Sequence, residues 1–401
     1  MATAVLRLRI TGSPGAYTVS AEVGDEQESD TLGALPDKLR ETLQPLQEAI
    51  LLTTESLRNR ALARAHPIPP APDAARAAPV RGFPLAEGFA DAKNIQEIGV
   101  RLFDSVFQPE IYKVYKDSLD AAIRDESELH IKLCVEPPEL SYVPWETMFD
   151  KRGLFYLSCS QRTPFARAAT MKELDLHIYD KLPLRVLCMV SAPNDFVGTA
   201  YELRTDVEQA ALDHALEPLK ANNQVKLGWT ASGTQRELTT RIIKGDDGEK
   251  WDVFLFIGHG LQGQVVFEED GGSGYQLVSA DVLRGILDSK RGPKLVILNS
   301  CRGASKPEDR LASTAETLVK GSGIAAVVAM QFDISDVMGT KFSPAFFSSL
   351  MLKVPIQQAM TLTRLALLGE GFTEWISPVL YMQNKDGQVW RDAPATAAGG
   401  A

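Results

Sequence analysis

The second half of the chain alternates short, almost entirely apolar segments with segments of helical spacing. Apolar runs of this kind are typical of strands that are buried on both faces of a parallel sheet. The spacing predicts strands at residues 184–190, 224–229, 252–257, 294–298, 324–329 and 378–382, with helices at 201–221, 234–244, 281–289, 314–320, 340–352 and 356–369. This alternation predicts an α/β fold in which helices flank a mostly parallel sheet.

The first half of the chain predicts an N-terminal α+β module and a second α+β region. Strand-like spacing at residues 4–10 and 16–23, around a Gly-Ser-Pro-Gly turn, predicts a hairpin. Residues 61–90 are rich in Ala and Pro, which is typical of a linker or of an extended segment lying over the surface; we favour the linker. The other segments expected here are helices at 35–64 and 92–124 and strands at 130–135, 154–158 and 174–179.

These patterns divide the chain into five regions. They are a hairpin plus helices at 1–65, an Ala/Pro-rich linker at 66–91, an α+β region at 92–182, the α/β domain at 183–391 and an Ala/Gly-rich tail at 392–401. The tail has no large apolar residues with which to build a core, so we expect it to be disordered.

The charge balance and the cysteines narrow the classes of function. A net charge of −10, from 42 Lys and Arg against 52 Asp and Glu, argues against a nucleic acid or an anionic membrane as partner. The four cysteines are scattered without a CxxC pair, so neither a disulfide framework nor a thiolate zinc site is expected. Because the sequence has neither a signal peptide nor an apolar run of the roughly 18 residues that span a membrane, we expect a cytoplasmic protein with reduced thiols.

A histidine and a cysteine directly follow two consecutive apolar strands. The strand at 252–257 leads into Gly258, His259 and Gly260, and the strand at 294–298 leads into a loop that carries Cys301. Reactive groups of open α/β sheets gather beyond the carboxyl ends of the strands. We therefore expect both side chains at the same edge of the sheet, on neighbouring strands.

This pairing suits nucleophilic catalysis. A free thiol is only slightly ionised near neutral pH and needs a base, and a histidine within hydrogen-bond reach can take the thiol proton and return it to the leaving amine. The backbone N–H groups of Gly260 and Cys301 are candidate donors to the developing oxyanion. No third and fourth ligand for a metal is evident, so we predict no metal site and no cofactor.

Other interpretations of these residues remain open. Cys301 alone would be interpreted as a buried structural thiol, and Ser300 is a rival nucleophile whose hydroxyl is much harder to ionise. The remaining histidines have no nucleophile near them at a strand end, and we interpret them as ordinary hydrogen-bonded residues: His66, His130, His177 and His214. Residues 268–272 (EEDGG) lack the ligand spacing of a calcium-binding EF-hand, and a solvated hairpin tip is favoured.

The motifs around the pair resemble those of caspase-like cysteine peptidases of clan CD, and specifically of bacterial CHAT-domain proteins. The catalytic half of the resemblance is carried by residues 254–260 (FLFIGHG) and 299–303 (NSCRG), the second with Asn-Ser where caspases have Gln-Ala. The segments that usually precede it are matched by residues 137–140 (PPEL), 143–150 (VPWETMFD) and 157–167. The resemblance covers roughly residues 95–390.

The resemblance implies a caspase-like fold and a peptidase dyad, with His259 as the general base and Cys301 as the nucleophile. Asp195 follows the first strand of the α/β domain, and Asp333 and Asp336 follow the fifth, so all three are expected at the same edge. They are candidates to line an acidic pocket for a basic substrate side chain. The alternative, that each is a loop or helix-capping aspartate, is favoured for each one individually.

The function predicted from these residues and this resemblance is a regulated cysteine endopeptidase that cleaves a protein or peptide substrate. The resemblance associates it with bacterial defence or regulated cell death. Because no TPR array is present, regulation is expected from the N-terminal part, from an encoded neighbour or from a partner, and we favour a regulatory protein partner. A catalytically silent caspase-like scaffold is the main alternative, and a small-molecule thiol hydrolase is a weaker one. Exposed loops expected at 192–200, 262–278 and 302–313 are the candidate sites of proteolytic processing.

Overall fold

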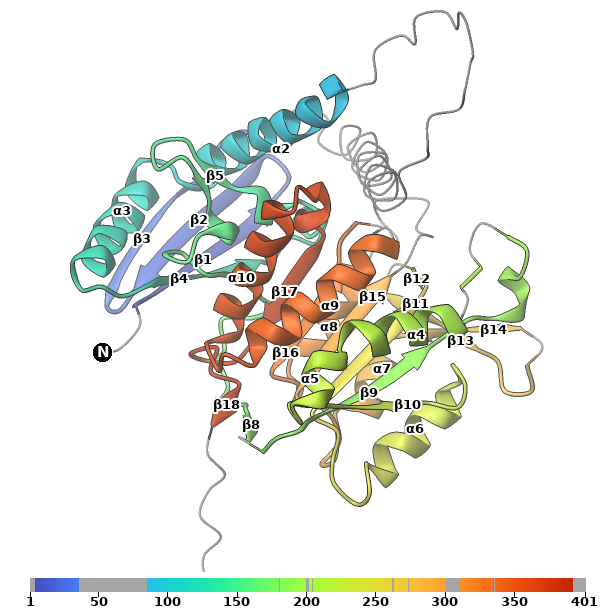
Figure 1. The fold of residues 1–401 in the computed structure, drawn as a ribbon. Coiled ribbons are helices and arrows are strands. Elements are labelled where there is room, and N and C mark those ends of the chain that lie inside the picture. Colours follow the sequence, from blue (N-terminus) through green and yellow to red (C-terminus); the bar gives the residue numbers. More distant parts are fainter. Residues whose placement is uncertain are drawn as a thin grey trace, which may run out of the picture.

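A large mixed β-sheet organises the fold (Figure 1). The computed structural model describes residues 4–35, 85–179, 181–199, 202–203, 205–261, 263–272, 274–300, 311–332, 334 and 336–391. Within this part of the chain the sheet has 11 strands. In spatial order they are β10 (Val225–Trp229), β9 (Leu184–Val190), β11 (Val253–Gly258), β15 (Leu295–Ser300), β16 (Ala326–Met330), β17 (Pro378–Met382), β7 (Phe165–Ala168), β4 (Leu129–Val135), β1 (Ala4–Ser13), β2 (Ala16–Val23) and β3 (Glu26–Thr31).

The sheet consists of two parallel blocks that meet at one antiparallel pair. Strands β10, β9, β11, β15 and β16 run parallel to one another. Strand β17 is antiparallel to β16, and β17, β7, β4 and β1 then form the second parallel block. The carboxyl ends of the first block therefore lie together at one edge of the sheet. The predicted α/β fold with a mostly parallel sheet is confirmed, and it fits a caspase-like architecture.

Helices cover both faces of the first block, because successive side chains of each strand point to opposite faces. Along β11, Val253, Leu255 and Ile257 pack into one buried cluster, and Phe254 and Phe256 pack into another. The first cluster includes side chains of α4, α9 and α10, and the second includes side chains of α6, α7 and α8. The helices are α2 (Leu85–Val106), α3 (Pro109–Arg124), α4 (Thr205–Ala215), α5 (Glu217–Ala221), α6 (Gln235–Lys244), α7 (Ala280–Leu287), α8 (Leu311–Val319), α9 (Asp336–Leu350) and α10 (Ile356–Gly369).

Two helix starts are fixed by local capping. The Thr234 hydroxyl accepts a hydrogen bond from the N–H of Glu237 at the start of α6, and the Ser279 hydroxyl accepts one from Val282 at the start of α7. Such caps satisfy N–H groups that the first turn of a helix leaves without a partner.

The predicted N-terminal hairpin is confirmed, and it joins the main sheet. Strands β1 and β2 pair antiparallel, and β3 adds a further strand that the sequence pattern did not predict. Strand β1 also pairs in parallel with β4, from Ala4 opposite Leu129 to Ile10 opposite Val135. The structure does not describe residues 36–84, which include most of the predicted helices at 35–64 and most of the predicted linker at 66–91. Helix α2 begins at Leu85, before the start predicted at residue 92.

Small sheets and single turns of 3-10 helix complete the fold. One small sheet consists of β12 (Gly260–Leu261), β13 (Gln264–Glu268) and β14 (Tyr275–Ser279), and the two others pair β5 (Phe149–Asp150) with β6 (Phe155–Tyr156) and β8 (Ile178–Tyr179) with β18 (Trp390–Arg391). The 3-10 helices are η1 (Pro138–Leu140), η2 (Trp145–Thr147), η3 (Leu157–Cys159), η4 (Asn194–Phe196) and η5 (Thr373–Ile376).

Two predictions about these segments were wrong. Residues 262–278 are not one exposed loop, because they contain all of β13 and all but the last residue of β14. These strands form because Val265, Phe267 and Val278 are buried in the second core cluster, so alternate positions face the interior. Residues 154–158 are not a continuous strand. The strand ends at Tyr156, and the Leu157 N–H donates to the Met148 carbonyl as η3 begins.

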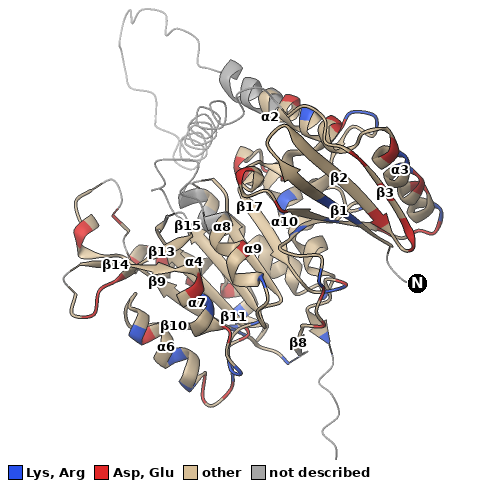
Figure 2. Ribbon diagram, turned by 180° about the vertical axis from the view of Figure 1, so that it is seen from behind, with Lys and Arg blue, Asp and Glu red and all other residues tan. Residues whose placement is uncertain are grey.

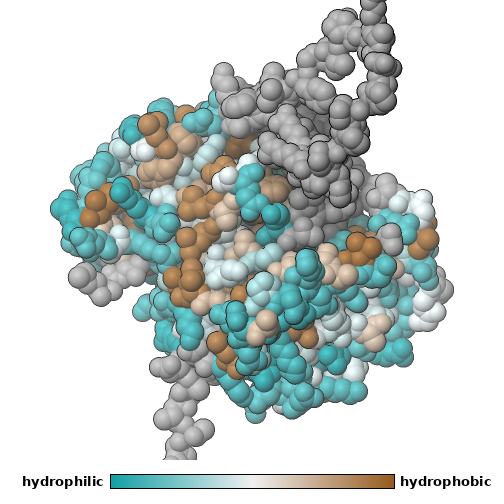
Figure 3. Space-filling model, viewed as in Figure 1, coloured by the Kyte–Doolittle hydropathy of each residue, from teal (hydrophilic) through white to brown (hydrophobic). Residues whose placement is uncertain are grey.

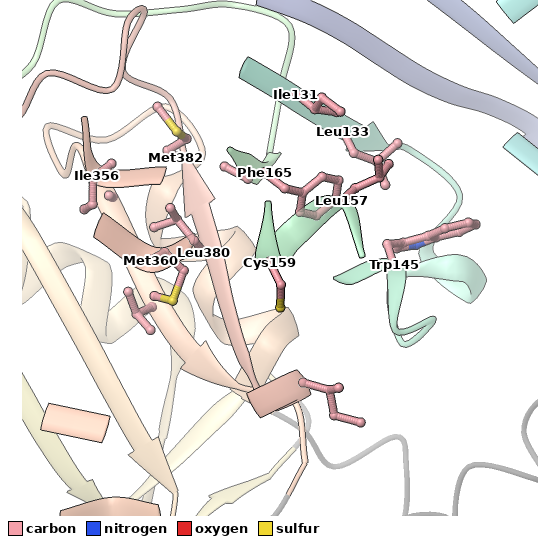
Figure 4. Close-up of a cluster of buried hydrophobic side chains, with 14 of the residues drawn as sticks. Ile131, Leu133, Trp145, Leu157, Cys159, Phe165, Ile356, Met360, Leu380 and Met382 are labelled. Atoms are coloured by element: carbon pink, nitrogen blue, oxygen red, sulfur yellow. The ribbon is translucent and has the colours of Figure 1, made fainter. Parts of the chain in front are cut away.

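Figure 4 shows the core under the second block of the sheet. Side chains of β4, β7, β17 and α10 meet there, among them Leu133, Phe165, Leu380 and Met360. The sulfur of Cys159 lies in the same apolar surroundings. Because this cluster joins elements that are far apart in the chain, it packs the 92–182 region against the C-terminal strand and helix.

The surface mixes charged, polar and apolar groups. Acidic and basic residues are interspersed over the elements in Figure 2, with acidic residues along α3. On the face shown in Figure 3, hydrophobic residues form separate patches within a mainly hydrophilic surface. Among the helices that the structure describes, none is both long and apolar enough to cross a membrane.

Candidate active site

His259 stands at the carboxyl end of a central, fully buried strand. It is the residue after β11, every residue of which is buried, and its own side chain is only 6% exposed. Strand β11 lies between β9 and β15, so the carboxyl ends of these two strands flank the end of β11 that His259 follows. The position of His259 follows from the sequence. The apolar run at 253–257 is buried as a strand, and the polar histidine comes just after that strand ends.

The neighbouring strand leads to Cys301. Strands β11 and β15 pair in parallel, and the last two pairs are Ile257 opposite Asn299 and Gly258 opposite Ser300. The predicted adjacency of the two strands is therefore confirmed. His259 and Cys301 come directly after these strands in the sequence, and Cys301 itself lies outside the described residues.

The small sheet β12–β13–β14 continues the chain from His259 (Figure 1). The His259 carbonyl accepts a hydrogen bond from the Val266 N–H at 2.9 Å, and Gly260 is opposite Val265 in the next pair. Hydrogen-bonded and non-hydrogen-bonded pairs alternate along an antiparallel ladder. The Gly260 N–H is therefore directed away from β13.

One aromatic ring contacts the imidazole, and a second ring stacks on the first. Phe196, the last residue of η4, meets the His259 ring edge to face, with centroids 5.0 Å apart and an interplanar angle of 86°. The Tyr275 ring of β14 stacks on Phe196 at 5.6 Å and 24°. Edge-to-face and offset stacked contacts are the favoured geometries of aromatic pairs. The imidazole therefore lies at the end of an aromatic row that joins the loop after β9 to the small sheet.

The Glu268 side chain connects two loops at this edge. Its carboxylate accepts hydrogen bonds from the Ala192 N–H at 3.1 Å and from the Gly233 N–H at 2.8 Å. Ala192 belongs to the loop after β9 and Gly233 to the loop after β10. Gly233 is required by packing here, because a Cβ at this position would be 2.6 Å from the Cα of Ser191. The predicted solvated hairpin tip is wrong for Glu268, because its half-buried carboxylate bonds to backbone.

The three candidate pocket aspartates are only partly described. Asp195 lies in η4 and is exposed, one residue before Phe196. Asp333 lies outside the described residues. Asp336 begins α9, and its side chain is outside the described part. In the residues that the structure describes, no group of three or more His, Cys, Asp or Glu side chains is arranged to hold a metal ion.

The CHAT domain family model matches residues 96–399, about three quarters of the chain. The chain belongs to the CHAT domain family. This family is caspase-like and related to the clan CD peptidases. No curated protein matches the chain. The predicted resemblance is thus confirmed at the level of the family.

A buried polar network fixes the segment that precedes the first parallel block of the CHAT domain in the chain. The Arg167 guanidinium in β7 donates to the Glu146 carboxylate from Nε at 2.9 Å and from Nη2 at 2.5 Å. The Gln331 amide, next after β16, donates to Glu146 Oε2 at 3.0 Å and accepts from Arg167 Nη2 at 3.1 Å. A planar guanidinium fits a carboxylate through two parallel bonds, which fixes orientation. Residues 143–150 are thereby held at the edge where β16 ends.

Three of the four cysteines of the CHAT protein are buried free thiols. Cys134, Cys159 and Cys188 are 2%, 8% and 0% exposed. Burial raises the pKa of the Cys134 thiol to about 11 and that of Cys159 to about 12, and it also raises the pKa of Cys188. A thiol reacts as its thiolate, so these three thiols are poor nucleophiles near neutral pH.

The other described histidines of the CHAT protein lie away from this edge or on the surface. His130 is buried, with its Nε2 2.8 Å from a Glu128 carboxylate oxygen and its Nδ1 2.6 Å from the Gln357 amide nitrogen. His214 is exposed in the last turn of α4. His66 lies outside the described residues. The interpretation of His130 as an ordinary hydrogen-bonded residue is confirmed by these two contacts.

Sequence reasoning missed two residues beside the imidazole. Phe196 gave no signal, because a single aromatic residue in a predicted loop has no pattern around it. Glu268 was grouped with an acidic hairpin tip, although the apolar residues just before it, at 265–267, could have predicted a strand ending at this carboxylate. Phe196 contacts the His259 ring, and Glu268 bonds to the loops after β9 and β10. Both sets of contacts join parts of the chain that are distant in sequence.

Proposed function

We propose that this CHAT domain is a cysteine endopeptidase in which His259 is the general base and Cys301 the nucleophile. The observation that carries the proposal is the register of β11 and β15. Gly258 is opposite Ser300 at the ends of two adjacent parallel strands, and the two proposed reactive residues each come next in the sequence after this pair. The carboxyl ends of such strands are where α/β enzymes place reactive groups.

The reaction then follows the usual course of acyl transfer to a thiolate. The imidazole takes the proton of the Cys301 thiol, and the sulfur attacks the carbonyl carbon of the scissile peptide bond. The tetrahedral intermediate collapses as the imidazolium gives its proton to the leaving amine, which breaks the C–N bond and leaves a thioester. Water, deprotonated by the same imidazole, then hydrolyses the thioester and restores the thiol.

Other residues of this edge support the proposal in defined roles. The Gly260 N–H, which is directed away from β13, and the N–H of Cys301 are proposed as the donors to the oxyanion. Asp195, with Asp333 and Asp336, is proposed to receive a basic substrate side chain. Asp195 is exposed and adjoins Phe196, which contacts His259, so it has access to a bound peptide.

The test is a cleavage profile over a peptide library, run for the wild type and for the Cys301→Ala and His259→Ala variants. We expect both substitutions to abolish cleavage and the profile to favour Lys or Arg on the amino side of the cut bond. His214→Ala is the matched control, because that histidine is exposed and remote in sequence from the motif. Cleavage that persists in Cys301→Ala would refute the assignment.

We further propose that this peptidase acts in the cytoplasm, under the control of a protein partner, in bacterial defence or regulated cell death. This part is supported by the family resemblance alone. If it is correct, expressing the wild type together with its activating partner should stop cell growth, whereas expressing Cys301→Ala with the same partner should not. Equal growth in both cultures would count against the role in cell death.

A further inference from the structure

Glu268 is placed to set the geometry of two loops beside the candidate base. Its two carboxylate oxygens accept from two different loops, one oxygen from the Ala192 N–H and the other from the Gly233 N–H. The Glu268 N–H in turn donates to the Gly233 carbonyl at 2.9 Å. Hydrogen bonds to an ionised acceptor are stronger than neutral ones, so this carboxylate is a firm anchor for both loops.

The anchored loop after β9 leads directly to the ring that contacts the imidazole. From Ala192 the chain runs through Pro193 to η4, which ends at Phe196. A second contact fixes the same stretch, since the Asn194 side-chain amide donates to the Gly272 carbonyl at 2.5 Å in the turn between β13 and β14. The loop is therefore held to the small sheet both before Phe196 and within η4.

We propose that Glu268 and Phe196 are positioning residues that hold the His259 imidazole in the orientation needed to accept the thiol proton. The carboxylate fixes the path of the loop, and the loop holds the Phe196 ring edge to face with the imidazole at 5.0 Å. Neither side chain takes or gives a proton in the reaction. The proposal rests on the proposed role of His259 as the general base.

A change at Glu268 should therefore affect the chemical step. An amide in Glu268→Gln keeps the shape of the side chain but has only one oxygen, so it can accept from only one of the two backbone N–H groups. Misplacing a reacting group by about an ångström costs up to about a hundredfold in rate, and we expect kcat to fall by about tenfold or more with KM nearly unchanged. Glu269→Gln is the matched control, because Glu269 is the exposed neighbour on the same hairpin.

A second measurement tests the positioning without any need for activity. In protein labelled with ¹³C and ¹⁵N in histidine, the ring resonances of His259, assigned with His259→Ala, report its surroundings. We expect them to move in Phe196→Leu, which removes the ring current, and in Glu268→Gln, and to stay in place in Glu269→Gln. Unmoved His259 resonances in Glu268→Gln would overturn the proposal, whatever the rates are.

The two proposals can fail separately. If Cys301→Ala still cleaves peptides, the peptidase assignment fails, while the His259 resonances still decide whether Glu268 and Phe196 position the ring. If Cys301→Ala is inactive but Glu268→Gln has wild-type kcat, the positioning role alone is refuted. Should Glu268→Gln lose the fold, as judged by circular dichroism, the kcat of Phe196→Leu in η4 decides the outcome: a fall supports the positioning role and a wild-type kcat refutes it.

Discussion

Alkylation of the native protein should modify one cysteine out of four. The folded protein is treated with a limiting amount of iodoacetamide at pH 7.5. With a pKa of about 11 for Cys134 and about 12 for Cys159, the thiolate fractions are about 1 in 3,000 and about 1 in 30,000, against about 1 in 10 for an unperturbed thiol. Ionisation alone thus slows these two thiols by about 300-fold or more. Burial of Cys188, with no exposed surface, places it in the same class.

The assay is peptide mass spectrometry of the alkylated protein against time, in buffer and in 8 M urea. We expect a single fast label on Cys301 in buffer and four labels in urea, which matches the four cysteines of the chain. If His259 is the base, Cys301 should keep reacting at pH 6.5, and His259→Ala should shift its pH midpoint up towards the ordinary thiol value of about 8.5.

Two results would refute this reasoning. Fast labelling of Cys134, Cys159 or Cys188 in the folded protein would show that burial does not suppress their ionisation. Labelling of all four at one common rate, in every condition, would favour the silent scaffold over the peptidase. Cys301→Ala is the internal control, because native labelling should then disappear.

Three further predictions concern stability and are checked by urea unfolding. Burial raises the pKa of the Asp252 carboxyl to about 6, so the folded state binds the proton more tightly than the unfolded state, and stability falls as pH rises between about 4 and 6; Asp252→Asn, which can still accept from the Arg185 N–H, should add about 3 kcal/mol at pH 7.5 and almost nothing at pH 4. Arg167→Met should lower the free energy of unfolding by about 3–5 kcal/mol, because it leaves the Glu146 carboxylate buried without its cation. Adding Glu146→Gln should restore part of this loss. A double variant no more stable than Arg167→Met would contradict the prediction. Gly99→Ala should destabilise by about 1–3 kcal/mol, because the new Cβ would lie 2.0 Å from a backbone oxygen of η2; wild-type stability would show that α2 can move away.

The fold could be predicted from the sequence wherever one strand or helix carries its own pattern. The strands β9, β11, β15, β16 and β17 are each a short apolar run, so their existence and burial followed from local sequence. The capped starts of α6 and α7 were equally local, because Thr234 and Ser279 lie next to the helices that they cap. The candidate dyad was found for the same reason, since His259 and Cys301 each follow such a run directly.

Strands with a weaker pattern were missed or misread. Strand β3 has the sequence EQESDT, in which no apolar residue marks a buried face, and it exists because its backbone pairs with β2. Strands β13 and β14 were misread as a loop, because β13 has only three buried residues, β14 has only one, and the turn between them is acidic. Backbone pairing depends on the partner strand, and the residues of one strand do not identify the strand with which it will pair.

The sequence by itself determined the α/β class, the order of the strands along the chain and the two candidate residues, His259 and Cys301, that follow β11 and β15 in the sequence. Only the tertiary structure decided that β1 adds the N-terminal hairpin to the sheet, that Arg167 is buried against Glu146, and that Glu268 binds two loops beside His259. The physical reason is distance along the chain. Burial of an apolar run depends on the composition of that run, whereas a hydrogen bond between residues 76 positions apart exists only once the sheet has brought them together.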